Sequence, residues 1–340
     1  MKRILLFACG LFLFACTTVE PEAGMEIGES VKFRSGTYNL PCNPDDSLRS
    51  QLILISADSV TVDFNGAVLD GSREGQTPEL FGGVAVRVTG NYVTIKNLRA
   101  KGYKVAVYGE GCEGLSIIDC DLSDNYRQRL KSTREKEDFA DWFNFYDNEA
   151  DEWLQYGAAI YLKDCEKPLV KGCTVVRGEN GLLLSGTDSG LFYNNNFSFN
   201  SGLGIGLYRS CGNRVMHNRL DWNIRGYSHG VYNRGQDSSG ILAFEQSSDN
   251  VFAYNSATHG GDGFFLNAGS STIETGEGGS NNNLIYGNDF SYASNNALEM
   301  TFSSGNIAVK NKLNGSDYGI WGGYSYDCKI IANEILKNRE

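Results

Sequence analysis

The motif Asn-x-apolar recurs along the chain at a nearly constant spacing, and this repeat constrains the fold more than any other feature of the sequence. Four of the seven steps between successive copies are 22 or 23 residues long, and the steps of 33, 37 and 53 residues look like that period plus an insertion. A period of this length is typical of a solenoid, in which each repeat forms one coil. The copies begin at Asn195, Asn218, Asn255, Asn288, Asn311 and Asn333, and Cys120 and Cys173 hold the same position further upstream.

A second apolar run follows most of these asparagines after about eight residues. The runs are short, rich in aliphatic and aromatic residues, and bounded by Gly, Asn, Ser and Asp, which predicts strands joined by tight turns. The spacings typical of leucine-rich and helical repeats are absent from the sequence. An asparagine at one corner of every coil is best explained as an internal ladder, in which each side-chain amide bonds to the coils on either side. The runs are 204–208, 240–244, 263–266, 297–301 and 319–323.

This pattern resembles the right-handed parallel β-helix superfamily of pectate-lyase-like proteins over roughly residues 50–340. We therefore predict an all-β chain in which residues 27–340 form a single-domain right-handed parallel β-helix solenoid with 22–23-residue turns. Insertions are expected at about 126–155, 224–238 and 269–280. The resemblance implies a polysaccharide or oligosaccharide partner. It assigns no catalytic residue, because one fold carries many activities and the polygalacturonase motifs are absent from this sequence.

The N-terminus is predicted to be an export signal. A basic start, Met1-Lys2-Arg3, precedes an apolar stretch over residues 4–14 that is too short to cross a membrane. Its end, Leu13-Phe14-Ala15-Cys16, resembles a bacterial lipoprotein cleavage signal. Residues 1–16 would then be the signal peptide, Cys16 the lipidated residue and 17–26 a tether. This predicts a lipoprotein of the outer membrane or cell surface that meets the membrane only through its lipid; the alternative is an ordinary cleaved signal peptide.

Composition excludes several classes of partner and cofactor. A formal net charge of −11 disfavours nucleic acid, because phosphate binding needs a positive surface. Four Met, three His and the lack of a Cys-x-x-Cys pair argue against copper and zinc sites, and we expect no metal or other cofactor. Seven cysteines remain after Cys9 and Cys16, an odd number, and several hold matching positions in their coils. We expect small buried side chains stacked in the core, at Cys112, Cys165 and Cys211 and at Cys120 and Cys173.

The insertions are expected to border a groove. The first and second leave the solenoid just before the strands that begin near residues 158 and 240, and the third leaves just after residue 266. They would therefore wall both edges of one sheet, and such loops are where a repetitive scaffold acquires function. The first insertion should form one or two short helices, whose aromatic residues either bind sugar rings or anchor the insertion; for Trp142 and Trp153 we favour anchoring. Its other aromatic residues are Phe143, Phe145 and Tyr146.

Two carboxylates are predicted on this sheet. Because side chains alternate along a strand, Leu242, Phe265, Glu299 and Trp321 should form one outward column, with Phe244, Asn267, Thr301 and Gly323 in the next. Asp262 begins its strand on the coil before Glu299, so the two carboxylates should lie about 6–10 Å apart. This separation suits inverting glycoside hydrolysis, and apolar neighbours should raise the pKa of the acid. The alternative is that Asp262 caps a turn and Glu299 faces water.

Further candidates surround this pair. His259 precedes Asp262, and Glu245 with Asp237 is a spare carboxylate pair. Phe265, Asn267, Trp321 and Tyr324 are candidate sugar contacts. The second insertion adds reactive side chains that can bind an acidic sugar or move a proton, or that can simply pack the loop through Tyr residues and Arg–Asp pairs. These side chains are Arg225, Tyr227, His229, Tyr232, Arg234 and Asp237.

Three functions remain open from the sequence. The first is a glycoside hydrolase that uses Asp262 and Glu299. The second is a polysaccharide lyase acting on uronic acids, in which Arg225 or Arg234 neutralises the substrate and His259, His229 or a tyrosine abstracts the proton. The third is a non-catalytic glycan-binding β-helix. The sequence stops directly after a regular turn, so we also expect a partner or a missing segment to cover the C-terminal end of the solenoid.

Overall fold

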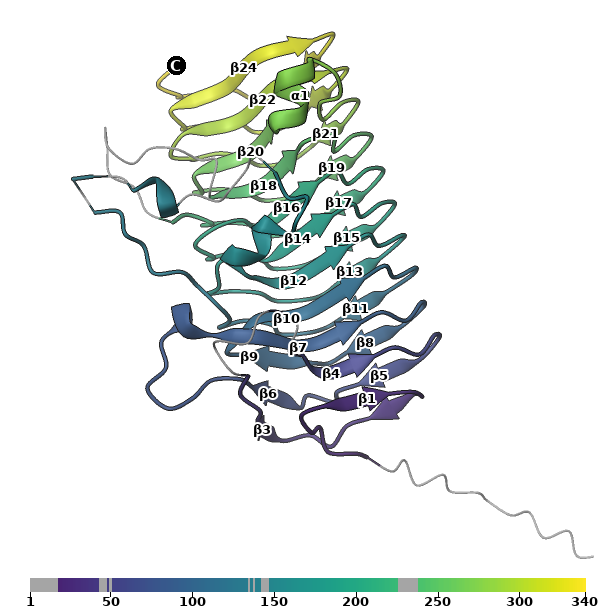
Figure 1. Cartoon of the computed structure of the whole chain (residues 1–340). Coiled ribbons are helices and arrows are strands. Elements are labelled where there is room, and N and C mark those ends of the chain that lie inside the picture. Colours follow the sequence, from purple (N-terminus) through teal and green to yellow (C-terminus); the bar gives the residue numbers. More distant parts are fainter. Residues whose placement is uncertain are drawn as a thin grey trace, which may run out of the picture.

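The chain winds into a stack of similar coils in a computed structural model (Figure 1). The structure describes residues 18–42, 48, 51–133, 135–136, 138–141, 147–225 and 238–340. In this part of the chain, each coil contributes one strand to each of two eleven-stranded sheets, and the strands pair in parallel. The first sheet contains β1 (Met25–Ile27), β4 (Gln51–Ile55), β7 (Gly82–Val88), β10 (Tyr103–Glu110), β12 (Ala158–Lys163), β14 (Leu182–Ser185), β16 (Ile205–Tyr208), β18 (Ser239–Phe244), β20 (Asp262–Asn267), β22 (Asn296–Ser304) and β24 (Tyr318–Tyr326).

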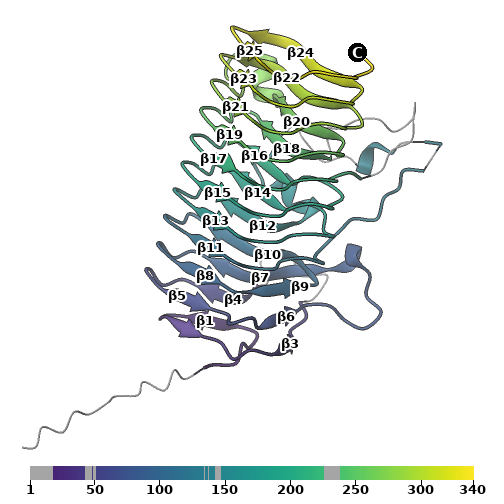
Figure 2. The same ribbon diagram turned by 180° about the vertical axis from the view of Figure 1, so that it is seen from behind.

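A second sheet and a short third sheet complete the coils. The third sheet has three strands, β3 (Thr37–Asn39), β6 (Val68–Asp70) and β9 (Arg99–Lys101), and continues as single-residue bridges up to Lys312 and Glu334. Figure 2 shows the same regular stack from behind. The predicted parallel solenoid is therefore confirmed. The second sheet contains β2 (Val31–Lys32), β5 (Thr61–Asp63), β8 (Thr94–Lys96), β11 (Ser116–Ile118), β13 (Leu169–Lys171), β15 (Leu191–Tyr193), β17 (Arg214–Met216), β19 (Val251–Ala253), β21 (Leu284–Tyr286), β23 (Ile307–Val309) and β25 (Lys329–Ile331).

Stacked apolar side chains fill the inside of the coils. Each strand of the first sheet alternates, so that Ile241 and Ala243 point inward while Leu242 points outward. The strand register stacks the inward residues of successive coils directly on one another. In the column that runs from Ile160 to Ile320, every residue except Ile320 is fully buried. Burying one such aliphatic or aromatic side chain contributes about 1.5–3 kcal/mol. One inward column runs through Ile160, Leu182, Ile205, Ile241, Phe264, Leu298 and Ile320.

The asparagine ladder is present. Asn255 Oδ1 accepts hydrogen bonds from the backbone N–H and the side-chain amide of Asn218, both at 3.0 Å, while Asn255 Nδ2 donates to the Val215 carbonyl at 2.8 Å. Each rung therefore satisfies buried polar groups of the preceding coil. A second ladder, which the sequence analysis did not predict, runs along the other end of the second sheet. Its members are Asn213, Asn250, Asn283 and Asn306.

The cysteines behave as predicted where they stack. Cys112, Cys120, Cys165 and Cys173 are buried, whereas Cys211, predicted to stack with them, is only half-buried. Among the described residues no cysteine forms a disulfide. The thiols act as small core side chains. The partners of each stacked pair lie on neighbouring coils, because Glu113 bridges to Glu166 and Asp121 bridges to Thr174.

The first coil begins earlier than predicted. Val19 pairs with Phe33, Glu20 bonds Arg34 at 2.5 Å, and β1 starts at Met25, so residues 19–26 contact the solenoid where a tether was predicted. The predicted signal peptide and Cys16 lie outside the described residues. Within the described ranges, no helix has the length and apolar character needed to span a membrane.

Two of the three insertions contain short helices. The first insertion carries the 3-10 helices η2 (Phe139–Asp141) and η3 (Glu152–Tyr156), and the third forms α1 (Ser270–Thr275). Another 3-10 helix, η1 (Pro78–Leu80), precedes β7. Most of the second insertion, residues 226–237, lies outside the described part. Figure 1 shows α1 beside the last strands of the first sheet, near the C-terminal end of the stack.

Candidate functional site

The outward columns of the first sheet have the predicted register. Phe265 pairs with Leu242 on one side and Glu299 on the other, and Glu299 pairs with Trp321. In the next column Thr301 pairs with Gly323, and its hydroxyl donates to Asn267 Oδ1 at 2.9 Å. The columns were predictable because side chains alternate along a strand. Once the register is known, each residue can belong to only one face of the sheet.

Much of this outer face is covered rather than open. Leu242, Phe244 and Phe265 are fully buried in a second hydrophobic cluster that includes Trp153 and Leu154 of the first insertion. The ring of Trp153 lies 5.5 Å from that of Tyr208. The prediction that the first insertion only walls a groove is therefore corrected: it lies across the sheet, because outward apolar side chains need a cover.

Polar contacts fix the first insertion to the sheet. Glu149 accepts a hydrogen bond from the Tyr208 hydroxyl at 2.9 Å and pairs with Arg209 at 2.7 Å. Asp151 pairs with Lys163 at 2.7 Å. Trp153 is thus an anchor, as favoured from the sequence. Phe265, which was predicted as a sugar contact, packs in the covered cluster instead.

Two carboxyl groups meet where the covered face ends. Asn296 donates its backbone N–H to Asp262 Oδ1 at 2.7 Å and its side-chain amide to Glu299 Oε2 at 2.6 Å. Burial and the negative charge of Asp262 raise the pKa of Glu299 to about 9, against the smaller opposing effect of the Asn296 amide. Glu299 therefore carries a proton at neutral pH, as a general acid must.

The two carboxyl groups differ in exposure. Asp262 is fully buried, and 8% of Glu299 is exposed. The bond from Asn296 N–H means that Asp262 caps the start of β22, which is the structural role that the sequence also allowed. The structure brings the predicted pair together but leaves Asp262 beneath the surface.

Glu245 holds the third insertion in place. Its Oε2 accepts the Gly269 N–H at 2.6 Å, and its Oε1 accepts the Thr272 hydroxyl at 3.1 Å. The side chain is almost fully buried. Glu245 therefore ties α1 to the end of β18, which differs from the predicted role in a spare hydrolytic pair.

His259 belongs to an exposed aromatic row at one corner of the coils. Its ring stacks 4.2 Å from Trp222 and 4.9 Å from Tyr292, and Phe199 extends the row beyond Trp222. The His259 Nδ1 lies 2.9 Å from the Thr258 hydroxyl. Both faces of the imidazole are thus packed against neighbouring rings, and His259 has a packing role in this row.

Arg225 is buried and donates to the Asp141 carbonyl of the first insertion. It links the two insertions, where the sequence suggested a substrate contact. The remaining predicted residues of the second insertion lie outside the described ranges; they are Tyr227, His229, Tyr232, Arg234 and Asp237. Among described residues, no group of three or more His, Cys, Asp or Glu side chains is arranged to hold a metal ion.

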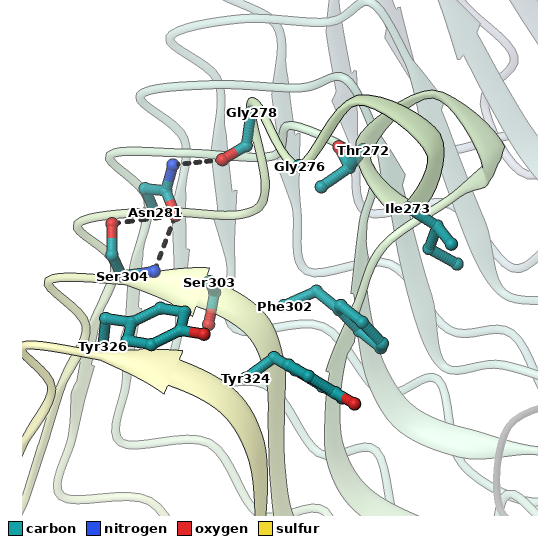
Figure 3. A pocket seen from close by; sticks show the side chains of 10 residues that line it. All are labelled: Thr272, Ile273, Gly276, Gly278, Asn281, Phe302, Ser303, Ser304, Tyr324 and Tyr326. Carbon is teal, nitrogen blue, oxygen red and sulfur yellow. Dashed lines mark hydrogen bonds between the residues drawn. The ribbon is translucent and has the colours of Figure 1, made fainter.

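A pocket of about 450 Å³ opens between α1 and the ends of β22 and β24 (Figure 3). Phe302 and Tyr324 stack within it at 4.9 Å and 13°. Tyr324 was predicted as a sugar contact, whereas Phe302 was not predicted to belong to the site. The signal was their spacing of 22 residues, one coil. The lining residues are Thr272, Ile273, Gly276, Gly278, Asn281, Phe302, Ser303, Ser304, Tyr324 and Tyr326.

Comparison with known proteins identifies relatives of the fold. A family model described as "Right handed beta helix region" matches residues 81–239 and 137–335. No curated protein matches the chain in sequence. The crystal structure of DFA-IIIase from Arthrobacter chlorophenolicus A6 without its lid, in complex with GF2, has a TM-score of 0.54 at 16% identity, covering 87% of this chain and 68% of that one.

Two further structures have similar scores. DFA-IIIase from the same organism in complex with GF2 has a TM-score of 0.52 at 15% identity, covering 80% of this chain and 63% of its own. The Dettilon tailspike protein has a TM-score of 0.52 at 13% identity, covering 91% of this chain and 55% of its own. The chain thus spans less than two thirds of either protein. At these identities the likeness shows the fold alone.

Proposed function

We propose that this chain, which belongs to the right handed beta helix family, is a glycoside hydrolase in which Glu299 donates a proton to the leaving group. Water adds to the sugar in place of the leaving group, and the proton that the water loses passes to the solvent, from which Glu299 is protonated again. Family membership together with the stacked parallel sheets confirms the predicted right-handed parallel β-helix. The activity is a proposal that rests on the site.

The observation that carries the proposal is the place of the Glu299 carboxyl, which is buried on the strand next to Asp262 and held by the Asn296 amide at 2.6 Å. Its pKa of about 9 keeps the carboxyl protonated at neutral pH, because the group is buried beside the Asp262 carboxylate. Trp321, on the next coil, is 46% exposed and offers an aromatic surface beside the carboxyl. A protonated carboxyl can donate the proton that a departing glycosidic oxygen takes, and an exposed indole beside it can pack against a sugar ring.

Asp262 and Asn296 act on Glu299 and not on the sugar in this scheme. The buried Asp262 carboxylate raises the proton affinity of Glu299, and Asn296 fixes both groups through its two hydrogen bonds. Asp262 is therefore a positioning residue, because its fully buried carboxylate has no access to the water that a general base must activate. The sequence-based role of Asp262 as the base is replaced by this tuning role.

The structural neighbours support a carbohydrate partner. They include DFA-IIIase in complex with GF2 and the Dettilon tailspike protein. A second candidate function, glycan binding without cleavage, is favoured by the small exposed fraction of Glu299. Of the residues named for the lyase alternative, Arg225 donates to a backbone carbonyl in the first insertion, and Arg234 and His229 lie outside the described ranges.

We further propose that the protein is exported and anchored by a lipid on Cys16. The proposal rests on the N-terminal sequence. Metabolic labelling with a palmitate analogue should mark the wild type and leave a Cys16→Ala variant unlabelled; labelling of both would contradict it.

The test compares wild type, Glu299→Gln and Glu274→Gln on a panel of neutral and acidic polysaccharides. Glu274 is an exposed carboxylate on α1 and serves as the control. We expect wild type and Glu274→Gln to release reducing sugars, and Glu299→Gln to lose about 100-fold or more in rate while keeping substrate binding.

Three other results would redirect the assignment. Full activity of Glu299→Gln would remove Glu299 from the mechanism. Binding by the wild type without turnover would leave a glycan-binding protein. Products with the ultraviolet absorbance of an unsaturated sugar would identify a lyase.

A further inference from the structure

We propose that the pocket between α1 and the ends of β22 and β24 is a subsite for a neutral sugar residue of the same glycan that reaches Glu299. The inference rests on the proposed function, which it deepens by naming the class of substrate. Figure 3 shows the stacked rings of Phe302 and Tyr324 with Ile273 of α1 nearby and Tyr326 on the other side.

The pocket lies further along the strands that carry Glu299 and Trp321, within the span of one oligosaccharide. Phe302 follows Glu299 by three residues on β22, a distance of about 10 Å along an extended strand. Tyr324 follows Trp321 by the same number of residues on β24. Between them lies Gly323, where an added Cβ would meet only Thr301 Cγ2 at 3.9 Å. The path from Trp321 to Tyr324 is therefore not blocked by a side chain at this position.

The chemistry of the lining selects a neutral ligand. Aromatic rings and Ile273 provide the apolar walls, and hydroxyl, amide and backbone groups provide the polar ones, with no charged side chain among the lining residues. A uronic acid would bring its carboxylate into this pocket without a cationic partner, which is unfavourable. A neutral sugar presents apolar C–H faces to the rings and hydroxyl groups to the polar atoms. Tyr324 and Tyr326, at 68% and 63% exposed, leave ring surface available.

The pocket is held in shape before any ligand arrives. Glu245 fixes the start of α1 through Gly269 and Thr272. Asn281 donates to the Gly278 carbonyl at 2.7 Å and accepts the Ser304 N–H at 2.7 Å, joining the insertion to β22. A wall fixed in this way lowers the entropic cost of binding.

The experiment measures binding of oligosaccharides to the Glu299→Gln protein by calorimetry, so that no ligand is consumed. The probes are neutral tetrasaccharides from glucan, mannan, xylan and fructan, with tetragalacturonate as the acidic probe. Tyr324→Ala is compared with Tyr292→Ala, because both tyrosines are exposed, have positive φ (56° and 62°) and stack on one aromatic neighbour. Tyr324→Phe keeps the ring and removes only the hydroxyl.

We expect at least one neutral probe to bind, with affinity about tenfold weaker in Tyr324→Ala and unchanged in Tyr292→Ala. Tyr324→Phe should stay close to the parent. Preference for tetragalacturonate, equal weakening by both alanine variants, or no binding by any neutral probe would overturn the subsite. Failure of the catalytic proposal is separate: Glu299→Gln would then cleave as fast as wild type while the Tyr324 result stands.

Discussion

Asp262 and Glu299, on neighbouring strands of the first sheet, are held by a single residue, since Asn296 donates its backbone N–H to the first and its side-chain amide to the second. Two buried carboxyl groups so close together do not both ionise at neutral pH, because the second charge would face both desolvation and repulsion. The proton resides on Glu299, whose pKa is raised to about 9.

This raised pKa predicts a pH-dependent stability. The folded protein keeps a proton on Glu299 that the unfolded chain releases above the ordinary glutamate pKa of 4.5. The contribution of Glu299 to the free energy of unfolding is therefore full below pH 4.5 and is lost progressively as the pH rises to about 9. Glu299→Gln stays neutral throughout, so its Tm relative to wild type should rise steadily from pH 5 to pH 9. Glu274→Gln should show no such trend, and parallel Tm curves for wild type and Glu299→Gln would contradict the assignment.

Asp262→Asn should lower the pKa of Glu299. The asparagine oxygen can still accept the Asn296 N–H, while the negative charge that disfavours ionisation of Glu299 is removed. The protonated Glu299 carboxyl should give an infrared band in wild type that is missing from the spectrum of Glu299→Gln. This band should titrate at a lower pH in Asp262→Asn than in wild type. If this protein hydrolyses glycans, the alkaline limb of its rate profile should move the same way. An unchanged titration would show that burial alone sets the pKa.

The sequence predicted the coil and the columns, because both follow from periodicity. A 22–23-residue repeat with asparagine at one corner sets the register, and alternation then places Glu299 beside Trp321. The order of residues along the chain does not say what covers the outer face. The outward residues Leu242, Phe244 and Phe265 were nevertheless a signal, since a wholly apolar outer patch needs a partner, and the first insertion supplies it.

The pocket escaped prediction for a related reason. Phe302 and Tyr324 follow the last regular outward position of their strands, where φ turns positive at 45° and 56° and alternation no longer predicts direction. For Glu245, the sequence predicted a reactive role that the structure does not show. A carboxylate at a strand end resembles a reactive group in sequence, but here it binds the backbone of the inserted helix.

Asn255→Ala should be strongly destabilising. The change removes the acceptor for two Asn218 donors and the donor to the Val215 carbonyl, all buried. Leaving such groups unsatisfied costs about 3 kcal/mol in the free energy of unfolding, measurable by urea denaturation. Asn333→Ala is the control: it makes the equivalent bonds to Asn311 and the Ala308 carbonyl, but it is only partly buried, so water can replace it. An equal decrease in the free energy of unfolding in both variants would show that burial does not determine how much a ladder asparagine stabilises the fold.

Trp153→Ala should release the first insertion from the sheet. The indole is fully buried against Tyr208 and Phe244, with ring centroids at 5.5 and 6.3 Å. Its removal leaves a cavity, and Tyr156 is then the remaining aromatic residue of η3. We expect a loss of about 3 kcal/mol, faster proteolysis between residues 147 and 156, and binding of a hydrophobic dye to the uncovered column. Trp153→Phe should retain most of the packing. Because Glu149 and Asp151 also fasten this segment, unchanged proteolysis of Trp153→Ala would mean that the ion pairs, and not the indole, hold the cover in place.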